Sequence, residues 1–156
     1  MLDSNEYKIS DRYVKNSGSV FLTGVQALAR LPIQQLRADK QRGLNTAAFL
    51  AGYPGSPLAG LNFEIDKAKS LVTDLPIIHR PVLNEEHAAT AVMGSQLAAE
   101  QPDCNYDGIF GLWYGKAPGL DRAGDALRHA VFTGTSRNGG AVAIVGDDPA
   151  AKSSTL

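Results

Sequence analysis

The sequence predicts an α/β fold in which a mostly parallel sheet carries helices on both faces, a three-layer α/β/α arrangement. Apolar runs without polar interruption, typical of strands buried on both sides, alternate along the chain with segments of helical periodicity. Glycine-rich and polar turns follow these runs, at the strand ends where parallel sheets bind ligands. A length of 156 residues is sufficient for one domain.

The N-terminal elements are predicted first. Residues 1–19 are polar and are expected to form an N-terminal arm, whereas residues 20–156 are expected to form the domain. A short apolar piece at residues 20–23 leads into a helical pattern at residues 26–31. Pro32 lacks a backbone N–H and is therefore expected to interrupt or restart this helix.

The remaining elements alternate between strand and helix. Strands are predicted at residues 46–51, at 77–78 with 82–83, at 108–114 and at 140–145, and helices at residues 58–71, from 85 onward and at 121–133. Pro81 is expected to split the second strand. Because the chain stops in a loop just after the last strand, the domain is expected to be truncated at its C-terminus.

Composition and charge exclude several classes of function. A hydrophobic content of 44% and a charged content of 20% are typical of a globular protein in solution. A net charge of −1 gives no basic footprint for nucleic acid or an anionic membrane, and no apolar run is long enough to span a bilayer. Cys104 is the single cysteine, which excludes an internal disulfide and a multi-cysteine iron–sulfur site in this chain. A cytoplasmic location is expected.

The segment from Asn84 to Gly94 is the most informative motif. It places Glu85 at the start of a helix of small residues, with Gly94 nine positions later. This arrangement resembles that of thiamine diphosphate enzymes, in which such a glutamate reaches the aminopyrimidine ring and the helix packs closely against a partner. A purely structural interpretation is also open, because Asn84 suits a helix N-cap and Glu85 and Glu86 suit the helix dipole.

Other motifs favour no chemistry of their own. Residues 146–153 resemble a phosphate-binding loop, but Ala151 replaces its second glycine and Pro149 removes a backbone donor, so a nucleotide triphosphatase is disfavoured. The turn at residues 52–57 lacks the G-x-S-x-G pattern of a nucleophile elbow. The three histidines share no metal-ligand spacing, and no metal ligand is predicted. Residues 113–116, with the glycines around them, are interpreted as either an active-site loop or a tight turn.

From residue 20 to its last residue, the chain resembles the N-terminal part of indolepyruvate ferredoxin oxidoreductase, in the large fused form of bacteria. The similar segments are residues 43–47, 52–58, 84–86, 88–92, 106–108, 113–116, 118–125, 134–136 and 146–156. The resemblance implies the pyrimidine-type domain of the thiamine diphosphate-binding fold. It also implies a part in the oxidative decarboxylation of indolepyruvate, an aryl 2-oxo acid, to the acyl-coenzyme A, with electrons passed to ferredoxin.

The resemblance also implies roles for individual residues. Glu85 is implied as the catalytic residue, which hydrogen-bonds the N1′ nitrogen of the aminopyrimidine, with Glu86 ranked second. Substrate-binding roles near the carboxylate of the 2-oxo acid are implied for Ser56 and Lys116. The residues implied to bind the cofactor are Gly52, Tyr53, Pro54, Gly55, Glu85 and Ala88.

Several parts of such an enzyme are expected outside this chain. The sequence lacks the G-D-G…N motif that holds Mg²⁺ and diphosphate in this family, and it lacks the cysteines for [4Fe–4S] clusters. We therefore expect an N-terminal fragment that is inactive alone, whose partners are the remaining domains of the same enzyme and a second copy in a dimer. A pyruvate or branched-chain 2-oxo acid oxidoreductase is the close alternative. A non-catalytic module that binds a partner through the helix at residues 88–95 is the alternative from another class.

Overall fold

The structure, a computed structural model, describes residues 7–56 and 58–147. Its helices are α1 (Asp11–Val14), α2 (Gly24–Gln41), α3 (Ala59–Leu71), α4 (Glu85–Ala99), α5 (Ala117–Arg122) and α6 (Gly124–Thr133). Its strands are β1 (Thr46–Gly52), β2 (Ile77–Pro81), β3 (Gly108–Gly115) and β4 (Gly140–Val145). None of the helices within the described ranges has the length and apolar character needed to cross a lipid bilayer.

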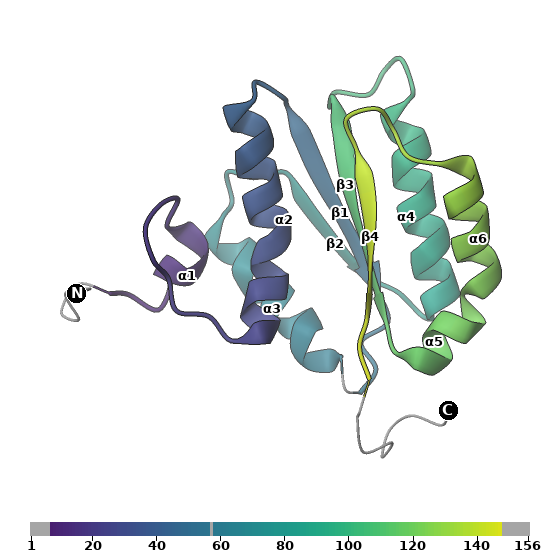
Figure 1. The fold of residues 1–156 in the computed structure, drawn as a ribbon, viewed down its shortest axis with the longest axis horizontal. Helices are drawn as coiled ribbons and strands as arrows, with labels where there is room; N and C mark the ends of the chain where they lie inside the picture. Colours follow the sequence, from purple (N-terminus) through teal and green to yellow (C-terminus); the bar gives the residue numbers. More distant parts are fainter. Residues whose placement is uncertain (1–6, 57, 148–156) are drawn as a thin grey trace.

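The four described strands form one parallel sheet in the order β2-β1-β3-β4. Helices α2 and α3 lie on one face of the sheet, while α4 lies on the other face with α6 beside it (Figure 1). The predicted α/β class with a parallel sheet between helical layers is therefore confirmed. Because all four strands run in the same direction, their carboxyl ends meet at one edge of the sheet.

The two faces of the sheet are packed with side chains of different size. The α2–α3 side contains large buried residues such as Ile33, Leu50 and Leu112. The α4 side is built mainly from alanines around Trp113. A Cβ on Gly111 of β3 would lie 2.8 Å from a methyl carbon of Val92, so the small residues bring α4 close to the sheet.

Helix α2 continues through Pro32, so the predicted interruption at that residue is wrong. Its first turn is closed by a capping box, in which Thr23 Oγ1 accepts from the Gln26 N–H at 3.3 Å and Gln26 Oε1 accepts from the Thr23 N–H at 2.9 Å. Pro32 is itself fully buried, as is Ile33 beside it. The burial of this face compensates for the backbone hydrogen bond that proline cannot make.

The predicted helix at residues 121–133 is divided into α5 and α6. The division occurs at Ala123, which is fully buried and has φ −84° and ψ 2°. This bend allows Ala123 to join the alanine-rich core while α6 continues along α4. The predicted break at Pro81 lies at the last residue of β2, and the Val82 N–H donates to the Gly52 carbonyl at 3.1 Å.

Helix α1, within the expected N-terminal arm, is packed against α2 and α3. Tyr13 of α1 is fully buried in the larger core, and its hydroxyl donates to the Glu64 carboxylate. The Arg30 guanidinium donates to the Lys15 carbonyl at 2.7 Å, and the Arg37 guanidinium donates to the Val14 carbonyl at 3.1 Å. Two arginines of α2 therefore hold this segment through backbone oxygens of α1 and the residue that follows it.

Candidate functional site

The turns that were predicted to bind a ligand meet at the carboxyl edge of the sheet. The Val82 N–H donates to the Gly52 carbonyl, and the Gly146 N–H donates to the Gly115 carbonyl, each at 3.1 Å. These bonds keep neighbouring chain segments together just beyond the ends of the strands. The turns after β1, β2 and β3 are therefore held in one region, together with the start of α4 (Figure 1).

Glu85 is the first residue of α4 and is 8% exposed. The helix starts there because the Asn84 side chain accepts from the His87 N–H at 2.9 Å. The Glu85 carbonyl accepts from the indole Nε1–H of Trp113 at 2.9 Å, which joins the start of α4 to the end of β3. The Glu85 side chain reaches Gly119 of α5, where an added Cβ would come within 2.5 Å of the carboxyl group.

The neighbouring carboxylate is placed differently. Glu86 is exposed, as is His87, whereas Glu85 is turned toward β3 and α5. An acid surrounded by protein is the one that can present a fixed hydrogen-bonding group to a ligand at this edge. The structure thus gives Glu85 and Glu86 different surroundings.

The turn after β1 combines a buried glycine with exposed polar groups. Gly52 is buried, and a Cβ there would lie 2.3 Å from the Tyr114 ring, so this position has no room for a side chain. The Tyr53 ring lies over Gly55 and is 40% exposed. Pro54 and Ser56, which follow Tyr53 along the same turn, are exposed as well. The exposed groups of this turn are available at the carboxyl edge.

Two further residues with implied roles have contrasting positions. Ala88 is fully buried in the cluster that contains Ala51 and Trp113, so in this chain it packs α4 onto the sheet and exposes no surface. Lys116 is half-buried and is the N-cap residue of α5, directly after β3. Asp148 and the later part of the segment at 146–153 lie outside the described residues.

Trp113 and Gly119 both contact Glu85. Trp113 belongs to the segment interpreted as an active-site loop or a tight turn, but no contact with Glu85 was predicted for either residue. The only signal in the sequence is that a tryptophan and two glycines lie close together in the segment at 113–119. Their contact with Glu85 joins residues about thirty positions apart, and it depends on how α4 and α5 are placed over the end of β3. Local patterns cannot specify that placement.

A polar network lies on the opposite face of the end of β3, in which His79, Tyr114 and Asn62 are buried and Asp66 is exposed. His79 Nδ1 lies 2.7 Å from the Asp66 carboxylate, and His79 Nε2 lies 2.9 Å from the Tyr114 hydroxyl. That hydroxyl donates to Asn62 Oδ1 at 2.7 Å. Burial, and then the negative charge of Asp66, raise the pKa of Tyr114 above its ordinary value. Neighbouring side chains Trp113 and Tyr114 thus anchor the end of β3 on its two faces.

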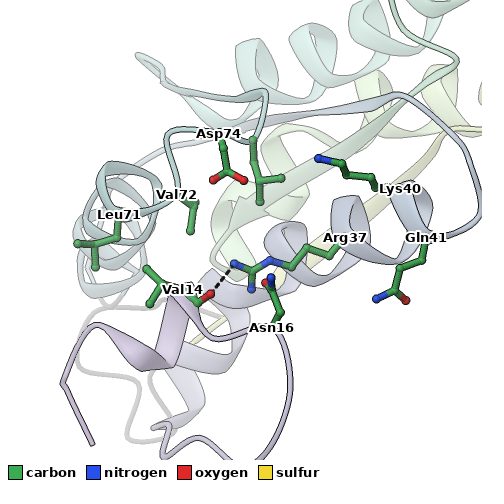
Figure 2. A pocket seen from close by; sticks show the side chains of 9 residues that line it. Val14, Asn16, Arg37, Lys40, Gln41, Leu71, Val72 and Asp74 are labelled. Carbon is green, nitrogen blue, oxygen red and sulfur yellow. Dashed lines mark hydrogen bonds between the residues drawn. The ribbon is translucent and has the colours of Figure 1, made fainter. Parts of the chain in front are cut away.

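A separate cavity of about 440 Å³ lies near the segments that precede β1 and β2, away from Glu85 (Figure 2). The Arg37 guanidinium points across it and donates to the Val14 carbonyl at 3.1 Å. Lys40 and Asp74 also line it, so its charges are mixed. None of the residues with implied roles lines this cavity. The positively charged guanidinium of Arg37 is already hydrogen-bonded to a backbone oxygen.

Within residues 7–56 and 58–147, no group of three or more His, Cys, Asp or Glu side chains is arranged to hold a metal ion. Comparison of the chain with protein-family models, curated proteins and solved structures found no match. The functional interpretation therefore depends on the motifs of the sequence and on the geometry at the carboxyl edge.

Proposed function

We propose that this chain is the pyrimidine-binding portion of a thiamine diphosphate-dependent 2-oxo acid:ferredoxin oxidoreductase, with indolepyruvate as the preferred substrate class. The observation that carries this proposal is the placement of Glu85. A carboxyl group stands at the first residue of a small-residue helix, at the carboxyl edge of a parallel sheet, with only 8% of the residue exposed. The choice of indolepyruvate comes from the resemblance in sequence alone.

The residues at this edge fit the pyrimidine end of the cofactor. When bound, thiamine diphosphate supplies the electron sink for decarboxylation of a 2-oxo acid. Glu85 would share a proton with a ring nitrogen, a role for which a carboxyl group largely removed from water is suited. Asn84 fixes the start of the helix and Trp113 fixes the Glu85 main chain, so the acid is held from two sides. Tyr53 and Ser56 offer exposed side chains at the same edge.

The proposed site requires groups that other domains would supply. Mg²⁺, the diphosphate contacts and the [4Fe–4S] clusters are assigned to the remaining domains of the same enzyme, together with the steps that use coenzyme A and ferredoxin. A dimer is proposed as well. On this proposal the present chain holds one half of a cofactor cleft and has little activity alone.

The alternative of a partner-binding module loses support at α4. The face of this helix that carries Ala88, Ala89 and Val92 is buried against the sheet of the same chain. The exposed face carries Thr90 and Gly94, and a Cβ on Gly94 would have nothing within 4 Å. Leu97 of the same helix is 45% exposed, but a single exposed apolar side chain beside small residues does not identify a partner, so no second function is proposed.

The experiment is a calorimetric titration of thiamine diphosphate with Mg²⁺, into this chain alone and into this chain mixed with the downstream polypeptide. Binding only in the mixture is expected. Glu85→Gln should keep the fold and sharply lower turnover of the complete enzyme, because the proton can no longer be shared with the ring nitrogen. Glu86→Gln is the matched control, since the adjacent carboxylate is exposed, and it should retain turnover. Absence of binding in both titrations, or near-normal turnover of Glu85→Gln, would refute the proposal.

A further inference from the structure

Gly119 lies where an added side chain would collide with the Glu85 side chain in its present position. A Cβ built on this residue would lie 2.4 Å from Glu85 Cγ and 2.5 Å from both Glu85 Cδ and Oε1. Real Cβ atoms essentially never approach so closely, so an added Cβ would force the flexible end of the Glu85 side chain to shift. The atoms of the Glu85 carboxyl group therefore fill the space that any other residue at position 119 would need.

The backbone of Gly119 does not explain why this residue is a glycine. The glycines with positive φ among the described residues are Gly18, Gly43 and Gly134, and Gly119 is not one of them. Gly119 lies inside α5, where alanine is favoured over glycine by about 1 kcal/mol on local grounds. The contact with Glu85 is thus the structural reason for glycine at this position.

We infer that Gly119 is a positioning residue for Glu85, an inference that rests on the proposed function of that acid. The indole of Trp113 holds the Glu85 carbonyl at 2.9 Å, which fixes the main chain. The bare Cα of Gly119 then lets the carboxyl group lie against α5. Gly115 contributes on the same side, since its Cβ would lie 3.2 Å from Glu85 Cγ and 2.6 Å from the Trp113 ring.

The consequence of adding one methyl group follows from these distances. To reach ordinary van der Waals contact with an alanine at position 119, the Glu85 carboxyl group must move by roughly 1 Å, and a displacement of that size can cost roughly 100-fold in rate. Gly119→Ala should therefore impair the chemistry of the acid more than it impairs ligand binding. A glycine needed only for the stability of α5 would not produce that difference.

The first test is a double-mutant cycle in this chain, measured by urea unfolding. Gly119→Ala is introduced with Glu85 present and again with Glu85→Ala, which removes all three contacting atoms. The urea midpoint should fall in the first case and should stay unchanged or rise in the second. Gly24→Ala is the control, because its Cβ would have nothing within 4 Å, and its effect should be the same in both backgrounds.

If Gly119→Ala alone fails to fold, the double variant decides the question. Recovery of folding in Gly119→Ala with Glu85→Ala would support the inference, and failure of the double variant to fold would overturn it. Equal shifts of the urea midpoint in the two backgrounds would also overturn it. These outcomes are independent of whether the chain binds thiamine diphosphate.

The second test uses the chain mixed with the downstream polypeptide and thiamine diphosphate with Mg²⁺. The rate of hydrogen–deuterium exchange at C2 of the cofactor should fall roughly 100-fold in Gly119→Ala, with a much smaller change in affinity. An exchange rate equal to that of the wild type would overturn the positioning role. If the wild type itself binds no cofactor, the proposed function fails, and that failure is visible before any glycine variant is made.

Discussion

Tyr114→Phe removes one hydroxyl group from the buried network and should lower the stability of the chain. Tyr114 is fully buried, and its hydroxyl is hydrogen-bonded to Asn62 at 2.7 Å and to His79 at 2.9 Å. Leaving a buried polar partner unsatisfied costs about 1 to 3 kcal/mol. Two unsatisfied partners would cost about 2 to 6 kcal/mol in total. Because His79 retains its contact with Asp66, the expected loss of unfolding free energy lies in the lower half of that range, about 2 to 4 kcal/mol.

The assay is urea unfolding followed by far-ultraviolet circular dichroism at neutral pH. Tyr106→Phe is the matched control, because Tyr106 is 36% exposed and loss of its hydroxyl should change the unfolding free energy by less than about 0.5 kcal/mol. The reasoning would be refuted if the two variants had the same stability as the wild type.

The raised pKa of Tyr114 also predicts how the stability of the wild type and of Tyr114→Phe should differ at high pH. The folded-state pKa of Tyr114 is raised by burial and by Asp66, above an ordinary value of 10.0. The protonated Tyr114 hydroxyl therefore makes its full contribution to the free energy of unfolding below pH 10. This contribution is lost as the pH rises further, because the tyrosine of the unfolded chain releases its proton first. Stability of the wild type should fall above pH 10 by up to about 1.4 kcal/mol per pH unit more steeply than that of Tyr114→Phe. The pKa of Tyr13 is also raised by burial, so Tyr13 makes the stability of both proteins fall with pH. This effect is the same in the wild type and in Tyr114→Phe, and it cancels when the two are compared.

Two further predictions concern the helix that begins at Glu85. Asn84→Ala removes the side-chain oxygen that accepts from the His87 N–H, and it should cost about 1 kcal/mol in urea unfolding, whereas Asn84→Ser should restore most of that loss. An unchanged midpoint for the alanine variant would show that this cap contributes nothing. Gly94→Ala should stabilise the chain by up to about 1 kcal/mol in thermal unfolding, because its Cβ meets nothing within 4 Å and alanine favours a helix; a lower melting temperature would contradict the packing described for α4.

Local pattern was sufficient to predict β1, β3 and β4, whereas β2 runs through to Pro81 and lacks the predicted second piece at residues 82–83. For β1 and β3 the reason is visible in their burial. The run at residues 46–51 became β1 (Thr46–Gly52), whose residues are nearly all buried, whereas the run at 140–145 became β4 with the same bounds although most of its residues are exposed at the edge of the sheet. A segment covered on both faces must be apolar throughout, so its pattern is hard to confuse with another element. The parallel arrangement then brought the predicted turns to one edge.

Patterns were insufficient where a residue acts through distant neighbours. Pro32 was expected to break its helix, but the burial of Pro32 and Ile33 overrides that local preference. The bend at Ala123 likewise depends on a core formed with residues from β1, β3 and α4. The contact between Gly119 and Glu85 joins two helices across the end of a strand, and no periodicity of either helix encodes it.

The bond between Trp113 and Glu85 also gives the chain a built-in optical reporter. Trp113 is the one tryptophan in the sequence, it is 1% exposed, and its indole N–H is bonded to the main chain of Glu85. Fluorescence excited selectively in tryptophan therefore originates entirely from Trp113 in β3, beside the start of α4, without background from elsewhere in the chain. A shift in the emission of this chain would report directly on the surroundings of Glu85, and no label would have to be attached.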